Sequence, residues 1–195
     1  MGAFSEIFGY LLQTFLSLYL VAMLLRFLLQ LVQADFYNPI SQFLVKATNP
    51  LVLPLRKVIP GFGGLDITSL LLSLLLQVAS IIAILTAHGA GLPNMLLLFI
   101  WASLGIAGLL VKIYFFALLA MIILSWIAPG GNNPAIYLLH QITEPVMIPV
   151  RKLLPAMGGL DFSPILVFIL INVMQIALRH MAAGVGLPSA LVMGL

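Results

Sequence analysis

The chain of 195 residues is 63% hydrophobic and only 7% charged, with a net charge of +3 and no cysteine. Soluble domains have roughly a quarter of their residues charged, so this composition excludes that class and favours a small membrane protein. The lack of cysteine in the sequence excludes disulfides, thiol redox chemistry and thiolate metal sites.

The first apolar run, 7–32, contains one charge, Arg26, and is long enough to cross a bilayer of ~30 Å. No Lys or Arg precedes it, and it is longer than the apolar region of a cleaved signal peptide. We therefore expect a retained first span at about 8–32.

A more polar connector follows at 38–66. Asn38 and Pro39 suit the N-cap and first position of a helix. The next apolar residues recur at the spacing of one helix face, namely Ile40, Phe43, Leu44 and Ala47. The polar residues between them are expected to face away, namely Ser41, Gln42 and Lys46. This pattern predicts a short amphipathic helix in the headgroup plane. Prolines at 50, 54 and 60 predict that no long helix forms there.

Asp66 is expected to cap a second span at 67–87. This span carries Ala79, Ala83 and Ala87 at four-residue spacing, a small-residue face that favours internal packing or, alternatively, a homo-oligomer contact.

The next apolar run, 95–127, is too long for one crossing and too short for two. We assign 103–127 to the third span and leave 95–102 as either an interfacial tail or a helix extension.

A second connector, 133–161, repeats the first at an offset of 95 residues and precedes a fourth span at about 162–182. The two connectors share asparagine, proline, a basic pair, glycines and aspartate in one order; the shared positions include Asn38/Asn133, Pro39/Pro134, Pro50/Pro145, Pro54/Pro149, Arg56/Arg151, Lys57/Lys152, Gly64/Gly159 and Asp66/Asp161. We predict an all-α polytopic membrane protein with two tandem two-span repeats, 1–95 and 96–195. Whether the tail at 190–195 is interfacial or embedded stays open.

Basic residues predict the orientation. Both connectors are rich in them, namely Lys46, Arg56, Lys57, Arg151 and Lys152. Because Lys and Arg accumulate on the cytoplasmic side, we expect cytoplasmic connectors and termini on the outer side.

The Arg-Lys pairs have two interpretations, a plain topology signal or a contact site for anionic lipid headgroups or an acidic partner. Asp66 and Asp161 are interpreted as helix caps, like Asn38 and Asn133; the alternative is an ion or proton ligand.

Three charges inside apolar runs, Arg26, Lys112 and Arg179, are functional candidates by position. No Asp or Glu lies within a span, which argues against a carboxylate proton relay. The three histidines, His88, His140 and His180, lack metal-ligand spacing, and no phosphate loop or nucleophile elbow occurs. We expect neither an enzyme nor a bound metal or cofactor.

The doubled motif Asn-Pro…Pro-x-Arg-Lys-x-x-Pro…Gly-Gly-x-Asp resembles the YggT (YlmG) family, with two copies covering nearly the whole chain. The resemblance implies a bacterial inner-membrane protein and associations with cell division, nucleoid distribution, haem attachment and osmotic tolerance, without a shared biochemical activity. Haem attachment transfers poorly, because His140 is replaced by Val45 in repeat one.

Two functions fit these features. The first is a non-enzymatic membrane organiser or assembly factor that contacts anionic lipid and another membrane protein, such as division or assembly machinery, and no nucleic acid directly. The second is a small oligomeric channel or transporter linked to osmotic or ion stress, with Lys112 lining an anion path.

Overall fold

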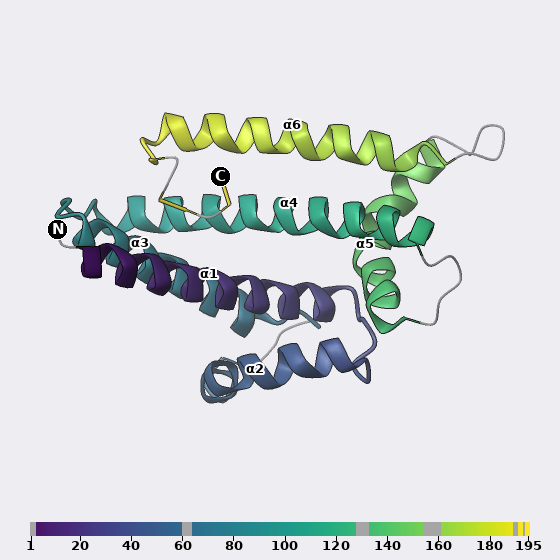
Figure 1. The fold of residues 1–195 in the computed structure, drawn as a ribbon, viewed down its shortest axis with the longest axis horizontal. Coiled ribbons are helices and arrows are strands. Elements are labelled where there is room, and N and C mark those ends of the chain that lie inside the picture. The colour runs from purple at the N-terminus through teal and green to yellow at the C-terminus, as the bar shows by residue number, and fades with distance from the viewer. Residues whose placement is uncertain (1–2, 60–63, 128–132, 154–160, 189–190, 193) are drawn as a thin grey trace.

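The computed structural model describes residues 3–59, 64–127, 133–153, 161–188, 191–192 and 194–195, and these residues form helices without any strand. The helices are α1 (Ala3–Leu31), α2 (Pro39–Arg56), α3 (Ile67–Ala87), α4 (Met95–Ile127), α5 (Pro134–Leu153) and α6 (Ser163–Gly184). Figure 1 shows α1, α4 and α6 running side by side, with α5 crossing one end of the bundle and α2 beside α1. The all-α prediction is confirmed.

Within the part of the chain that the structure describes, four helices are long and apolar enough to span a membrane: α1 over Gly9–Leu31, then α3, α4 and α6. Their bounds fall close to the predicted spans except in α4, which starts at Met95. Segment 95–102 is therefore a helix extension. At 1.5 Å per residue the 33 residues of α4 reach about 50 Å, longer than the hydrocarbon core.

Helix α4 lies at the centre of the fold and packs against α1, α3, α5 and α6. Its contact with α3 joins the two repeats, since α3 ends repeat one and α4 begins repeat two. Within the described residues, α6 packs only on α4 and α5.

The prediction that proline prevents long connector helices is wrong. Helix α2 runs for 18 residues through Pro50 and Pro54, and α5 runs for 20 residues through Pro145 and Pro149. Each proline removes one backbone donor and bends the helix instead of ending it. Figure 1 shows α2 turning toward the viewer near its end.

The buried face of α2 differs from the predicted one. Ser41 is buried together with Leu44, Thr48 and Val52, so it does not face away as expected. Phe43 from the apolar stripe is instead exposed. Helix α2 thus has both polar and apolar residues on the face toward the protein, and its outward face carries Phe43 together with Gln42 and Lys46.

The C-terminal tail returns into the bundle. Leu187, Leu191 and Val192 are buried against α3 and α4, and a Cβ on Gly108 would overlap the backbone of Gly194. The described part of the tail, 191–192 and 194–195, is embedded in the protein. Residues 189, 190 and 193 lie outside the described residues.

Candidate functional site

A buried ionic cluster lies where the first connector meets the spans of repeat one. Asp66 caps α3, accepting from the backbone N of Ser69 at 3.2 Å and from its hydroxyl at 2.6 Å. The same carboxylate pairs with two guanidinium groups: Oδ2 lies 3.4 Å from Nε of Arg26 and 3.2 Å from Nη2 of Arg56. Asp66 is fully buried, so this N-cap also neutralises charge inside the fold.

Arg26 connects this carboxylate to α2. Its Nη1 donates to Thr48 Oγ1 at 2.7 Å, to Asn49 Oδ1 at 2.8 Å and, more weakly, to the carbonyl of Val45 at 3.4 Å. Its side chain is only 6% exposed. Since an unpaired buried charge costs several kcal/mol, these contacts explain how α1 tolerates an arginine.

Arg56 completes the cluster from the last turn of α2. Its Nη2 also donates to Gln30 Oε1 at 3.1 Å, so the cluster joins α1, α2 and α3. Two guanidinium groups and one carboxylate give it a formal charge of +1.

Opposing effects act on the pKa of Asp66. Burial raises it, but the hydrogen bonds from Ser69 and the charges of Arg56 and Arg26 together hold the pKa below its ordinary value. The carboxylate is therefore ionised at neutral pH.

Repeat two builds a different cluster at the equivalent place. Arg151 pairs through Nη1 with Glu144 Oε1 at 2.9 Å and through Nε with Asp161 Oδ2 at 3.1 Å. All three side chains are about 40% exposed, and the cluster carries a formal charge of −1. Hydrogen bonding from Ser163 and the neighbouring Arg151 lower the pKa of Asp161.

Two replacements distinguish the clusters. At an offset of 95 residues, Arg26 corresponds to Met121 and Asn49 corresponds to Glu144. Thr143, the equivalent of Thr48, places its hydroxyl 3.3 Å from the sulfur of Met121. Repeat two thus has methionine in place of the buried cation and a second carboxylate beside its arginine.

The members of each Arg-Lys pair differ in their surroundings. Arg56 and Arg151 point toward carboxylates within their repeats, whereas Lys57 and Lys152 are exposed, as is Lys46. The sequence treats the pair as one basic site, and the structure separates an inward arginine from an outward lysine.

The asparagines at the connector starts accept helix N–H groups. Asn38 Oδ1 accepts from the backbone N of Ile40, and Asn133 Oδ1 accepts from that of Ala135, both at 2.9 Å. Asn38 also donates to the carbonyl of Pro134 at 2.8 Å, which ties the two connectors together. The cap prediction for Asp161 is wrong in its position, because the N-cap of α6 is Phe162. Asp161 lies one residue before this N-cap, and its Oδ1 accepts from the backbone N of Ser163.

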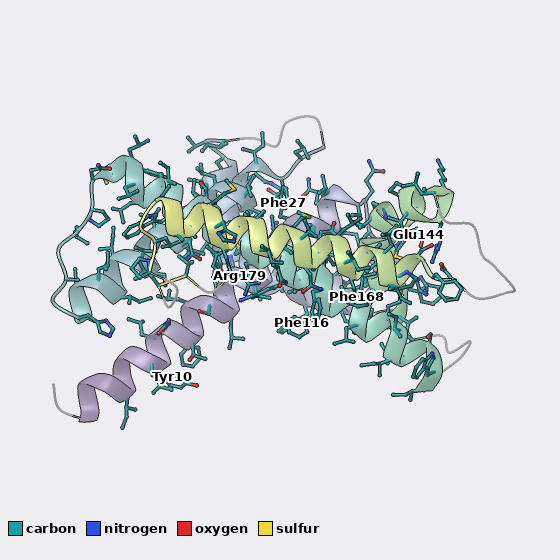
Figure 2. All side chains as sticks on the ribbon, turned by 90° about the horizontal axis from the view of Figure 1, so that it is seen from above. Tyr10, Phe27, Phe116, Glu144, Phe168 and Arg179 are labelled. Carbon is teal, nitrogen blue, oxygen red and sulfur yellow. The ribbon has the colours of Figure 1, made fainter. Side chains whose placement is uncertain are left out.

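The other intramembrane cations lie apart from these clusters. Arg179 is exposed on α6, and Figure 2 shows it far from Glu144 on α5. Lys112 is half-buried and lines a groove of about 460 Å³ between α1, α4 and α5. Within the described residues, no three histidine or acidic side chains gather as metal ligands.

Sequence reasoning missed the pairing of Arg26 with Asp66, because Asp66 lies just outside its span and 40 residues away in the chain. The alignment of the repeats contained a signal: the repeat that has Met121 in place of Arg26 also has Glu144 in place of Asn49.

The family profile described as CCB3/YggT matches the chain twice, over residues 5–87 and 100–182. The uncharacterized protein PA0392 of Pseudomonas aeruginosa is 50% identical over 184 residues, 93% of each chain. The uncharacterized protein YggT of Escherichia coli K12 is 39% identical over 177 residues, covering 91% of this chain and 92% of the relative. No solved structure gives a significant match.

Proposed function

The chain belongs to the CCB3/YggT family, and on that premise we propose that it is a non-enzymatic organiser or assembly factor of the bacterial inner membrane. In this proposal the connectors α2 and α5 lie on the cytoplasmic side. They contact anionic lipid headgroups and dock a second membrane protein.

The observation that carries the proposal is the composition of the exposed connector surface. Helix α2 exposes Phe43, Leu51 and Leu53 near Lys46 and Lys57. Helix α5 exposes Tyr137, Ile148 and Leu153 near Lys152. Apolar side chains with lysines beside them suit the boundary between headgroups and acyl chains, where each basic residue contributes about 1 kcal/mol on an anionic leaflet.

The ionic clusters support this assignment by giving the arginines another role. Arg56 and Arg151 fix each connector to the span that follows it. The exposed lysines are then the cations available to lipid or partner. This division makes a sharper test than removing all basic residues together.

We would place a photo-crosslinking amino acid at Phe43, which is 68% exposed, in the otherwise unchanged chain. The proposal expects a discrete protein adduct in cells, lost when Lys46, Lys57 and Lys152 are changed to Gln. The same probe at Phe116, 62% exposed on the membrane-spanning helix α4, is expected to give lipid adducts only.

Arg179→Gln is the matched charge control, because it removes an exposed cation far from the connectors. The adduct should survive this change. Absence of any protein adduct at Phe43, or an adduct that persists in the triple lysine variant, contradicts the proposal.

A further inference from the structure

We propose that α6 of one copy packs on α1 of a second copy and reproduces between chains the contact that α3 and α4 make within the chain. The inference rests on the repeat register and goes beyond the function proposed above.

The internal contact is the template. On α3, Val78 and Ile81 are buried in the same cluster as Ala102 of α4, and Leu74 packs with Ile106. Gln77 is 3% exposed and approaches Gly105, where a Cβ would lie 3.4 Å from its carboxamide carbon. The second span of repeat one thus covers the first span of repeat two.

The corresponding face of α6 is uncovered. Ninety-five residues after Leu74, Val78 and Ile81 stand Ile169, Val173 and Ile176, which are 53%, 56% and 49% exposed. Asn172 corresponds to Gln77 and is likewise exposed. Figure 1 shows α6 at one edge of the molecule.

The corresponding face of α1 is uncovered as well. Ile7, Leu11 and Phe15 correspond to Ala102, Ile106 and Leu110, and they are 60%, 47% and 69% exposed. Figure 2 shows the first half of α1, with Tyr10 labelled, at the edge of the molecule, where it borders α3 across a groove of about 250 Å³. Each chain therefore carries both faces needed to repeat the α3–α4 contact, one on its first span α1 and the other on its last span α6.

Lipid can cover apolar side chains, so exposure alone does not require a partner helix. Asn172 supplies the further reason. Its Nδ2 already donates to the carbonyl of Phe168 in the same helix at 2.8 Å. Its exposed Oδ1 gains by accepting a hydrogen bond from another helix in the hydrocarbon region. The residues of the template pair change in a compensating way: at the offset of 95 residues, Asn172 is shorter than Gln77, and Tyr10 is larger than Gly105. We assign Tyr10 of the second copy as the hydrogen-bond partner of Asn172.

The directions of the helices allow this contact. First spans α1 and α4 cross the membrane in one direction, and second spans α3 and α6 cross in the other, so two copies with the same orientation can form it. Two such contacts, α6 on α1 and α1 on α6, close a two-fold dimer of four repeats.

The test uses cysteine pairs, which is direct because the chain has no native cysteine. Ile169→Cys and Leu11→Cys are placed on two differently tagged copies, which are co-expressed and oxidised in membranes. The expected product is a mixed disulfide dimer containing both tags. Leu74→Cys with Ile106→Cys in one chain calibrates the reaction as an internal disulfide, and Ile169→Cys with Phe116→Cys is the mismatched control.

A mixed dimer no more abundant than in the mismatched control overturns the inference, and so does an excess of α6–α6 dimers from Ile169→Cys alone. Asn172→Leu and Tyr10→Phe should each lower the mixed-dimer yield about threefold, the effect of one interhelical hydrogen bond in a membrane. The readout does not involve the connector lysines, so it stands or falls separately from the proposed function.

Discussion

Asp66 holds the first repeat together because it satisfies three demands with one carboxylate. It caps α3, neutralises Arg26 and orients Arg56. Its counterpart Asp161 lies at the surface and pairs with one arginine. The same residue at equivalent positions of the two repeats therefore contributes differently to the free energy of unfolding.

We predict that Asp66→Asn destabilises the protein far more than Asp161→Asn. The first change leaves Arg26 buried without its counter-ion, a loss of about 3–5 kcal/mol for a broken buried pair. The second affects an exposed pair, worth about 0–1 kcal/mol. Thermal unfolding of both variants in detergent checks the order, and equal melting temperatures would contradict it.

We also predict that Arg26→Met, which copies Met121 of repeat two, costs less than Asp66→Asn. The variant removes the buried charge together with its hydrogen bonds, and Asp66 keeps Arg56 and Ser69. The expected loss is about 1–3 kcal/mol from the acceptors on Thr48 and Asn49 that lose their donor. A larger loss than in Asp66→Asn would show that the arginine itself, more than charge balance, holds the cluster together.

The lowered pKa of Asp66 predicts the acid response. A depressed folded-state pKa contributes stability that is fully present above the unfolded value of about 3.9 and is lost as pH falls toward the folded value. Melting temperatures should therefore be flat from about pH 7 to pH 5 and decline below about pH 4. Asp66→Asn should reduce this slope, and an unchanged slope would assign it to other carboxylates such as Asp161.

At the scale of elements, the spans were predictable and the connectors only in part. Apolar run length locates the spans, but it did not predict that 95–127 forms one continuous helix. Whether the connector helices continue through their prolines depends on two opposing free energies. Each internal proline costs a helix about 3 kcal/mol. Burial of residues such as Val52 and Met147, both fully buried, offsets that cost, and a sequence pattern does not reveal what they pack against.

The ionic clusters show the same limit. The pairing of Arg26 with Asp66 requires the antiparallel placement of α1 and α3 and the return of α2 beside α1, so local spacing does not predict it. Ser41 is a second example. The amphipathic pattern of α2 predicts that this serine is exposed, whereas packing in the fold buries it.

The basic connectors predict an orientation that cysteine labelling can check. Lys57→Cys and Lys152→Cys lie in the two connectors, and Ala90→Cys lies in the exposed link between α3 and α4. A membrane-impermeant maleimide should label only Ala90→Cys in intact cells and all three after permeabilisation. Labelling of either connector position from outside would reverse the topology.

At the scale of the whole molecule, the two repeats are similar in architecture and opposite in the charge of their clusters. They meet through α3 and α4 and through the connectors, where Asn38 donates to Pro134 and the backbone N of Asp35 donates to Gln141. The ionic cluster of formal charge +1 lies in repeat one, whose α3 packs against α4. The cluster of formal charge −1 lies in repeat two, whose α6 is at the edge of the molecule (Figure 1).

Lys112 is the residue on which a channel function would depend. The other side chains that line its groove are apolar, among them Val21, Leu25, Phe116 and Ile142. Apolar walls give a permeating anion no ligands to replace its hydration shell, which costs a charge heavily in hydrocarbon. We therefore predict that Lys112→Leu leaves anion flux in reconstituted vesicles unchanged, at the level of vesicles without protein. Flux that exceeds this level in the native chain and falls in the variant would favour transport over the organiser role, because the connectors are identical in the two proteins.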